Sequence, residues 1–326
     1  ARAEVTRAQS TCRWAAEEAR RDGGEVRRLD TDPAMSGRAA IIRRFPIGPV
    51  LGIAPFNFPL NLVAHKVAPA IAVGSPVVVK PSPRTPLSAW LPGGMLSGPD
   101  LPAGAVGVLP VGVELTLALV DDPRLPIVSF TGSDVVGFDL AARAPRKKVI
   151  LELGGDAAAI VCDDFKSDAD LAWVAKRVAT FSMYQAGQSC ISVQRLLVAE
   201  DLADRLIPMV VAEVRALGGG SAAQPGDSVG PVIDESSAQR LEAWIQEAVS
   251  SGAQLLCGGR REGTYVEPTV LREIPEATSL GHNEAFGPVL GIRTFRMVEE
   301  AFEIVNSPRA GLLCGVFTNT IQIAGR

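Results

Sequence analysis

One cysteine of the chain, Cys190, stands in a context that suits a nucleophile. It ends the polar stretch Gly187-Gln188-Ser189-Cys190 and precedes a β-rich run at 193–198. A thiolate attacks a carbonyl where it is partly exposed and near donors or positive charge, whereas most cysteines simply pack as small hydrophobes. The other four lie in or beside apolar runs, where packing is expected, or in a polar amphipathic segment: Cys162, Cys257, Cys314 and Cys12. Cys190 is therefore the candidate nucleophile.

A carboxylate at the end of a predicted strand is the candidate general base. Glu152 follows the apolar run Val149-Ile150-Leu151 and precedes Leu153-Gly154-Gly155. A general base needs such a position, partly desolvated so that its pKa rises towards neutrality. A solvated carboxylate at a strand end fits the same pattern.

Two more polar side chains follow predicted strands. Asn57 lies in Pro55-Phe56-Asn57-Phe58-Pro59, where a rigid, half-buried amide could donate to an oxyanion or simply form a turn. Lys80 ends the run Val77-Val78-Val79, and ligands of open α/β sheets gather at the carboxyl ends of strands. A solvated turn lysine is the alternative for Lys80.

A nucleotide-binding turn is suggested by the stretch from Ser129 to Gly137, although the chain has no GxGxxG sequence. Gly132 and Gly137 lie five residues apart, and Ser133 opens a predicted helix whose N-terminus could face a pyrophosphate. The same residues would also make an ordinary helix cap.

The elements that must position these residues alternate between short β-branched runs and helical segments. This alternation predicts a parallel sheet with crossover helices, in two α/β domains that meet near residue 155. Residues 1–25 read as a helix and 26–44 as a polar hairpin with no obvious core partner of its own, an arrangement that often pairs with another subunit. We expect strands at 50–54, 76–79, 106–109, 127–130, 149–151, 158–161, 193–198, 254–257, 289–294 and 312–317, with helices near 60–72, 85–97, 113–120, 134–143, 168–184, 200–217 and 235–250.

Composition excludes several classes of function. The 326 residues are 47% hydrophobic and 21% charged, with a formal charge of −4 and no long basic run, which argues against nucleic-acid binding. The two histidines and five irregularly spaced cysteines suggest neither a metal site nor a disulfide framework. Because no run approaches about 18 apolar residues, we expect no membrane partner and a cytoplasmic location.

Taken together, six motifs resemble the ordered series of the NAD(P)-dependent aldehyde dehydrogenase superfamily. The series spans essentially the whole chain and implies a Rossmann-type cofactor domain (1–154), an α/β catalytic domain (155–326) lacking its C-terminal segment, and a β-hairpin oligomerisation arm (26–47). It also implies a homodimer or homotetramer. The six motifs are Pro55-Phe56-Asn57-Phe58-Pro59, Lys80-Pro81-Ser82, Phe130-Thr131-Gly132-Ser133, Glu152-Leu153-Gly154-Gly155, Gly187-Gln188-Ser189-Cys190 and Glu284-Ala285-Phe286-Gly287-Pro288.

The resemblance implies roles for individual residues. Cys190 would attack an aldehyde, Asn57 would hold the oxyanion, Glu152 would activate the water that hydrolyses the thioester, and Lys66 would assist proton release from Glu152. Lys66 could instead be a simple surface charge. The cofactor, NAD or NADP, would contact Ala54, Pro55, Phe56, Lys80, Ser82, Pro83, Gly132, Ser133, Val136, Gly137, Leu153, Gly154, Glu284 and Phe286. The substrate would contact His65, Tyr184, Ser189 and Ile191.

Departures from the family pattern bear on specificity. Pro83 replaces a Glu that is frequent in NAD-preferring members, so we expect use of both cofactors and a shift towards NAD in Pro83→Glu. Asp156 replaces a Lys or Asn, a change expected to be tolerated. His65 and Ser192 would suit a polar or anionic aldehyde. The alternatives are a CoA-acylating semialdehyde dehydrogenase, in which a hydrolytic base is superfluous, and a non-catalytic structural relative.

Overall fold

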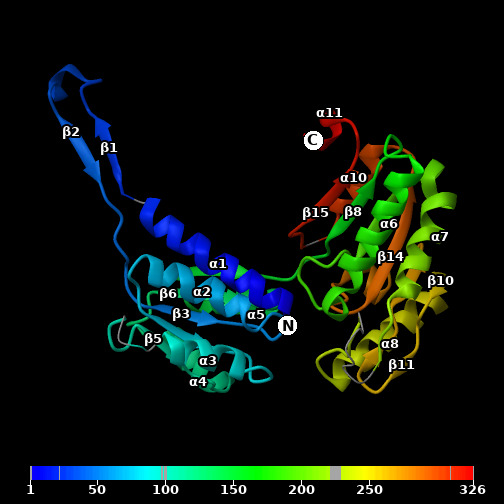
Figure 1. Cartoon of the computed structure of the whole chain (residues 1–326), viewed down its shortest axis with the longest axis horizontal. Coiled ribbons are helices and arrows are strands. Elements are labelled where there is room, and N and C mark those ends of the chain that lie inside the picture. Colours follow the sequence, from blue (N-terminus) through cyan, green and yellow to red (C-terminus); the bar gives the residue numbers. More distant parts are fainter. Residues whose placement is uncertain are drawn as a thin grey trace. The chain divides into compact units, whose positions relative to one another are not determined.

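The computed structural model divides the chain into two compact units, residues 1–153 and 154–326 (Figure 1). It describes residues 2–21, 23–96, 98, 101–220, 229–308 and 310–325. Each unit contains its own β-sheet. No helix among these described residues is long and apolar enough to span a membrane.

The sheet of the first unit has five strands, all parallel, in the order β5-β4-β3-β6-β7. The chain starts at the central strand β3, moves outwards through β4 and β5, and then returns to the other side for β6 and β7. The connections therefore reverse direction between β3 and β6, which is where open α/β sheets place their ligands. The strands are β3 (Val50–Ile53), β4 (Val77–Lys80), β5 (Val106–Val108), β6 (Ile127–Thr131) and β7 (Lys148–Glu152).

Helices pack on both faces of this sheet because successive residues of each strand point to opposite sides. Val50 of β3 belongs to the core formed with α2 and α3, whereas Leu51 and Ile53 belong to the core formed with α4 and α5. The helices are α2 (Asn61–Ala72), α3 (Leu87–Met95), α4 (Val113–Asp121) and α5 (Asp134–Arg143).

The N-terminal helix α1 (Arg2–Arg21) lies along α2 (Figure 1). The Glu4 carboxylate accepts hydrogen bonds from the backbone N–H groups of Leu60 (2.7 Å) and Asn61 (3.1 Å), so α1 caps the start of α2. An antiparallel hairpin follows, with exposed apolar side chains such as Val26 and Ile41. It comprises β1 (Glu25–Arg28), the 3₁₀ turn η1 (Pro33–Met35) and β2 (Ala39–Ile42).

The sheet of the second unit has six strands in the order β10-β13-β14-β9-β8-β15. All neighbours are parallel except β10 and β13. The strands are β8 (Ala158–Val161), β9 (Arg195–Ala199), β10 (Gln254–Cys257), β13 (Thr269–Arg272), β14 (Val289–Phe295) and β15 (Cys314–Phe317), beside a small hairpin of β11 (Arg261–Glu262) and β12 (Tyr265–Val266).

A single apolar core unites this sheet with its helices. Fully buried side chains such as Ile160, Leu171 and Leu196 belong to it. The helical elements are α6 (Asp168–Met183), the 3₁₀ turn η2 (Tyr184–Gly187), α7 (Glu200–Ala216), α8 (Glu235–Ser250), α9 (Ser279–His282), α10 (Val298–Asn306) and α11 (Ile321–Ala324).

Every strand and helix expected from the sequence is present, most with ends within two residues of the expectation. Sequence reasoning missed β11, β12, β13, α9, α10 and α11, and it did not foresee the antiparallel pairing of β10. These elements are mostly short, and β13 directly follows Pro268. A four-residue strand carries little periodicity of its own, so its neighbours in the sheet decide its conformation.

Candidate active site

The first unit gathers several predicted site residues at one edge of its parallel sheet. Lys80, Thr131 and Glu152 are the last residues of β4, β6 and β7, and Ala54 directly follows β3. Since the strands are parallel, their carboxyl ends lie along the same edge. Burial lowers the pKa of Lys80, which is half-buried. This edge includes the point where the strand order reverses, the usual site for a dinucleotide.

Two glycines shape the turn between β6 and α5. A side chain at Gly132 would collide with the Phe130 ring, and one at Gly137 would collide with Leu153. Gly137 is buried, and its lack of a side chain allows α5 to pack closely against Leu153; its contact with the cofactor stays a prediction. Ser133 is the exposed N-cap of α5, and Val136 is exposed on its first turns. The open end of α5 therefore fits an anionic group.

Lys66 of α2 is buried, with 4% of its surface exposed, so the alternative of a surface charge is wrong. Its Nζ donates hydrogen bonds to Thr131 Oγ1 (2.9 Å) and Ser129 Oγ (3.2 Å). Its stem lies under Gly52, where an added β-carbon would sit 3.1 Å from Lys66 Cβ and Cδ. Burial lowers the pKa of Lys66 to about 8, and the charge of Glu152 opposes that change. A lysine in this state can exchange a proton near neutral pH.

Asn57 and Glu152 differ in exposure from what the sequence suggested. Asn57 is 4% exposed rather than half-buried, and Glu152 is exposed rather than partly desolvated. Asn57 follows the half-buried Pro55 and Phe56. The Arg7 guanidinium of α1 lies 5.5 Å from the centre of the neighbouring Phe58 ring. A cation therefore lies on the ring of the residue that follows the predicted oxyanion donor, and the sequence had given no indication of it.

In the second unit, the loop before Cys190 is held in an unusual backbone conformation. Gln185, Ala186 and Gly187 have φ values of 56°, 54° and 67°, a left-handed run that disfavours side chains. A side chain at Gly187 would collide with the Gly287 carbonyl, so this loop packs directly on the 284–288 segment. The Gln188 side chain fixes the loop by accepting from Ile233 N (2.8 Å) and donating to Gln185 O (3.2 Å). Backbone strain of this kind clusters at functional sites.

Exposure alone does not single out Cys190. Cys190 is half-buried, while Cys162 and Cys257 are buried and burial raises the pKa of both thiols, that of Cys162 to about 11. Cys314 is exposed, so the packing expected from its apolar context is wrong: β15 is the last strand at its side of the sheet. The distinguishing feature of Cys190 is the strained loop in front of it.

The segment that carries Glu284 faces the Cys190 loop. Its Phe286 also has a positive φ, 46°. A side chain at Gly154 would collide with the Glu284 carboxylate, so this carboxylate lies directly against the glycine backbone. Arg240 of α8 donates to the Ala285 carbonyl (2.8 Å), and its charge interacts favourably with Glu284. The half-buried Glu284 and Phe286 are thereby held in place next to the nucleophile loop.

The predicted substrate residues have mixed settings. Tyr184 and Ile191 are half-buried beside Cys190, but Ser189 is only 4% exposed. Ser192 is buried and donates to the carbonyls of Phe181 (3.2 Å) and Ser182 (3.0 Å), so it anchors the loop and is not available to an aldehyde. His65 is exposed, and desolvation together with the charge of Arg7 lowers its pKa.

The remaining positions predicted for cofactor contact lie on or next to the sheet edge. Ser82 is buried and accepts a hydrogen bond from the Arg84 backbone N–H (3.2 Å), which rigidifies the turn after Lys80. Pro83 is exposed in the same turn, and Leu153 is half-buried against Gly137. No group of three potential ligands for a metal ion occurs among the described residues.

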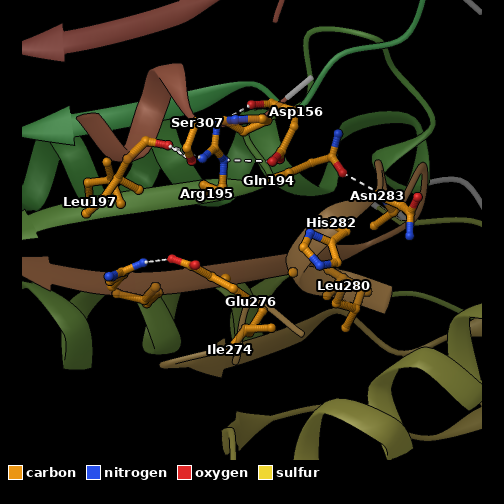
Figure 2. A pocket seen from close by; sticks show the side chains of 18 residues that line it. Asp156, Gln194, Arg195, Leu197, Ile274, Glu276, Leu280, His282, Asn283 and Ser307 are labelled. Carbon is orange, nitrogen blue, oxygen red and sulfur yellow. Dashed lines mark hydrogen bonds and ion pairs between the residues drawn. The ribbon is translucent and has the colours of Figure 1, made fainter. Parts of the chain in front are cut away.

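A cavity of the second unit shows two residues that sequence reasoning missed. Figure 2 shows Gln194, which directly precedes β9, and Arg195, the first residue of β9, near Asp156, with the end of α9 at His282 also lining this cavity. Arg195 pairs with Asp156 (2.9 Å) and donates to the Ile304 carbonyl at the end of α10 (2.8 Å). Asp156 thus has a counter-charge in Arg195, which agrees with the expectation that an acid is tolerated at this position. Only the position of Gln194 and Arg195 just after the Cys190 loop could have indicated them.

Comparison with known proteins shows which family this chain belongs to. The sequence profile described as the Aldehyde dehydrogenase family matches residues 1–326. The chain belongs to the aldehyde dehydrogenase family. It is 38% identical to an aldehyde-dehydrogenase-like protein of Sinorhizobium fredii, 36% to a 3-sulfolactaldehyde dehydrogenase of Priestia megaterium and 37% to the mitochondrial succinate-semialdehyde dehydrogenase of Arabidopsis thaliana, each over 99% of the chain. The chain spans 62%, 67% and 61% of these relatives, respectively.

Solved structures of aldehyde dehydrogenases share the fold. Aldehyde dehydrogenase 21 of Physcomitrella patens, solved with its product succinate, matches 99% of the chain at a TM-score of 0.95 and 44% identity. The NADP complex of an NADP-dependent glyceraldehyde-3-phosphate dehydrogenase from Bacillus halodurans matches at 0.93 and 33%, and an NAD⁺ complex from Mycobacterium tuberculosis at 0.89 and 32%. The chain covers 67%, 68% and 66% of these structures, and 99%, 99% and 98% of it is matched. The predicted family and fold class are confirmed.

Proposed function

We propose that the protein oxidises an aldehyde to a carboxylate with NAD⁺ or NADP⁺. The observation that carries this proposal is the strained loop in front of Cys190, packed against the Glu284 segment in a chain of this family. A backbone held in this way orients a thiol and a cofactor-binding carboxylate within one rigid element.

In the proposed reaction, the Cys190 thiolate adds to the aldehyde carbon and forms a thiohemiacetal. The Asn57 amide and the Cys190 backbone N–H donate to its oxyanion. The bound dinucleotide supplies the two-electron oxidant that converts the thiohemiacetal to a thioester. Glu152 then removes a proton from a water molecule that attacks the thioester carbon, and the C–S bond breaks to release the carboxylate and regenerate Cys190.

Lys66 is the proposed next proton acceptor after Glu152. With its pKa lowered to about 8, a substantial fraction of Lys66 is neutral in mildly alkaline solution. A neutral amine can take the proton that Glu152 removed from water, and the Ser129 and Thr131 hydroxyls hold that amine in place.

The residues at the edge of the first sheet fit a dinucleotide. We propose that Lys80, Ser82 and Pro83 contact the adenosine half, and that Gly132, Ser133 and Val136 at the start of α5 receive the pyrophosphate. Ala54, Pro55, Phe56, Leu153, Gly154, Glu284 and Phe286 complete the proposed set. The first unit would then be the cofactor-binding domain, the second the catalytic domain, and the exposed hairpin the pairing site for a second copy.

A short aldehyde that carries an anionic group is the proposed substrate class. Succinate, 3-sulfolactaldehyde and glyceraldehyde 3-phosphate, which appear in the names of the relatives, are all anionic. Among the described residues, a cation that suits such a group is Arg7, whose guanidinium lies over the Phe58 ring and whose charge lowers the pKa of His65. Arg7→Gln should raise the KM for succinate semialdehyde at least tenfold while leaving that for propanal within twofold; equal KM changes would remove Arg7 from substrate recognition.

The proposed function is tested with Cys190→Ala. The variant should form no NAD(P)H from a panel of anionic and neutral aldehydes, because the covalent step is gone. It should still bind the dinucleotide, since Cys190 does not hold it. Ser192→Ala is the matched control from the same loop and should remain active. Turnover by Cys190→Ala at the wild-type rate would overturn the proposal.

A further inference from the structure

The residue that joins the Cys190 loop to the Glu284 segment is Gln194. Its side chain is buried, with 6% exposed, and both ends of its amide are used. Nε2 donates to the Gly155 carbonyl (3.0 Å), and Oε1 accepts from the Ala285 backbone N–H (2.6 Å). Figure 2 shows the Gln194 side chain reaching from β9 towards the loop that carries Asn283. One amide therefore spans two of the motifs that surround the proposed site.

The hydrogen bonds of Gln194 act on the residues that hold Glu284. The residue after it, Ala285, is held on both sides of its backbone, by Gln194 at the N–H and by Arg240 at the carbonyl. The Glu284 carboxylate rests on Gly154, whose neighbour Gly155 is the other end of the Gln194 bridge. The position of the carboxylate relative to Gly154 therefore depends on the same side chain.

The neighbouring Arg195 has a different task. It holds the carbonyls of Ile304 and Val305 at the end of α10 and pairs with Asp156, without a hydrogen bond to the Glu284 segment among those described. Loss of Arg195 would disturb the second unit as a whole. Loss of the Gln194 bridge would leave the Ala285 N–H buried without its acceptor and release only the local link.

We propose that Gln194 is a positioning residue that sets where Glu284, a proposed cofactor contact, stands relative to the Cys190 loop, and so controls affinity for the dinucleotide. This inference rests on the proposed function. Gln194 touches neither substrate nor cofactor in this account; it acts through Ala285 and Gly155. Its chemistry requires one donor and one acceptor at fixed separation, which a glutamine provides at any pH near neutrality.

Two variants of the full chain test the bridge. Gln194→Met keeps the length and shape of the side chain but removes both hydrogen bonds, and we expect it to raise the Kd of the dinucleotide about tenfold, as loss of a buried hydrogen bond typically does. Gln194→Glu offers the same two interactions only when its carboxyl is protonated. It should bind the dinucleotide weakly at pH 8 and recover most of the wild-type affinity at pH 6, because burial raises the pKa of a carboxyl group.

Direct binding by isothermal titration calorimetry is the main readout, and kcat at saturating cofactor is the second. A positioning role predicts a raised Kd with kcat within about threefold of wild type. Ser192→Ala is the control, since Ser192 is equally buried and anchors the same loop through the Phe181 and Ser182 carbonyls. It should lower the melting temperature without changing the dinucleotide Kd.

The outcomes separate the two proposals. If the wild-type chain binds the dinucleotide and Gln194→Met binds it with the same Kd, the proposed role of Gln194 is overturned and the proposed function stands. If Gln194→Met does not fold, the pH dependence of Gln194→Glu decides, and a Kd ratio to wild type that is independent of pH would overturn it. A wild-type chain that binds neither NAD⁺ nor NADP⁺ would overturn the proposed function, and the role of Gln194 with it.

Discussion

Two cations, the buried Lys66 of the first unit and the half-buried Arg195 of the second, have opposite surroundings. Lys66, 4% exposed, rests on two neutral hydroxyls, and burial lowers its pKa to about 8. Arg195 has a carboxylate partner, Asp156, at 2.9 Å and hydrogen bonds to three backbone carbonyls. Lys66 lies beside β3, under Gly52, and Arg195 is the first residue of β9. Of the two, only the lysine can readily lose its proton.

The difference shows that the surroundings of a cation decide whether it can transfer protons or serves only to hold the structure together. A cation without a strong counter-charge is destabilised by desolvation and becomes a titrating group near neutral pH. A guanidinium that is paired and hydrogen-bonded stays charged and fixes the segments around it. Lys66 therefore suits proton transfer, and Arg195 suits holding β9, Asp156 and α10 together.

The largest expected effect is on stability, from Arg195→Met. Removal of the guanidinium leaves the half-buried Asp156 carboxylate without its partner, which should lower the free energy of unfolding by about 3 kcal/mol, the lower end of the range for buried pairs. The double variant Asp156→Leu/Arg195→Met should recover most of that loss, because no buried charge remains. Urea denaturation measures both. A loss below about 1 kcal/mol for Arg195→Met would show that the pair is not needed to hold these segments.

Lys66→Met, unlike Arg195→Met, should raise the free energy of unfolding at neutral pH. Because the folded pKa of Lys66 is lowered from 10.5 to about 8, the unfolded chain binds more protons between these values. Wild-type stability should therefore rise relative to the variant as pH increases from 8 to 10.5, and at pH 7 the variant should be more stable by up to about 3 kcal/mol. Denaturation curves at pH 7 and pH 10 test this, and a variant less stable than wild type at pH 7 would contradict it.

The same variant should lose catalysis while it gains stability. If Lys66 accepts the proton from Glu152, Lys66→Met should slow thioester hydrolysis by about a hundredfold, the lower range for acid–base catalysis. The burst of NAD(P)H that precedes hydrolysis should remain. Stopped-flow absorbance separates the two phases, with Lys147→Met as the control, since Lys147 is a half-buried lysine of the same unit that donates to the Asp122 carbonyl (2.6 Å). Loss of the burst itself would assign Lys66 to an earlier step.

The smallest effect is expected from Ser129→Ala. The hydroxyl of Ser129 accepts a hydrogen bond from Lys66 Nζ, and this bond favours the charged amine. Its removal should lower the pKa of Lys66 further, by about half a unit to one unit, and move the rising limb of the pH–rate profile to lower pH by the same amount. Thr131 remains as the second acceptor, so the lysine stays in place. An unchanged pH–rate profile would show that Ser129 does not tune Lys66.

The sequence was informative where a pattern is local. The β-branched runs located the strands, and so placed Lys80 and Glu152 at strand ends, because strand formation depends mostly on residues next to one another. The family and fold class also followed from motifs that are each only a few residues long.

The burial and the hydrogen-bond partners of polar side chains could not be predicted from the sequence in the same way. The burial of Lys66 depends on Gly52 and on hydroxyls 63 and 65 residues further along the chain. The bridge of Gln194 depends on Gly155 and Ala285, 39 and 91 residues away. Such contacts exist only after the sheet has assembled, so a buried polar side chain in the sequence looks the same as an exposed one.

The central claim is that aldehyde oxidation proceeds through a covalent bond to Cys190, and a trapped intermediate tests it most directly. Glu152→Gln is mixed with NADP⁺ and succinate semialdehyde, quenched in acid after the burst, and the Cys190 peptide is examined by mass spectrometry. We predict one acyl group per active site on Cys190, and none in Glu152→Gln/Cys190→Ala. An NADPH burst without an acyl group on Cys190 would contradict the mechanism.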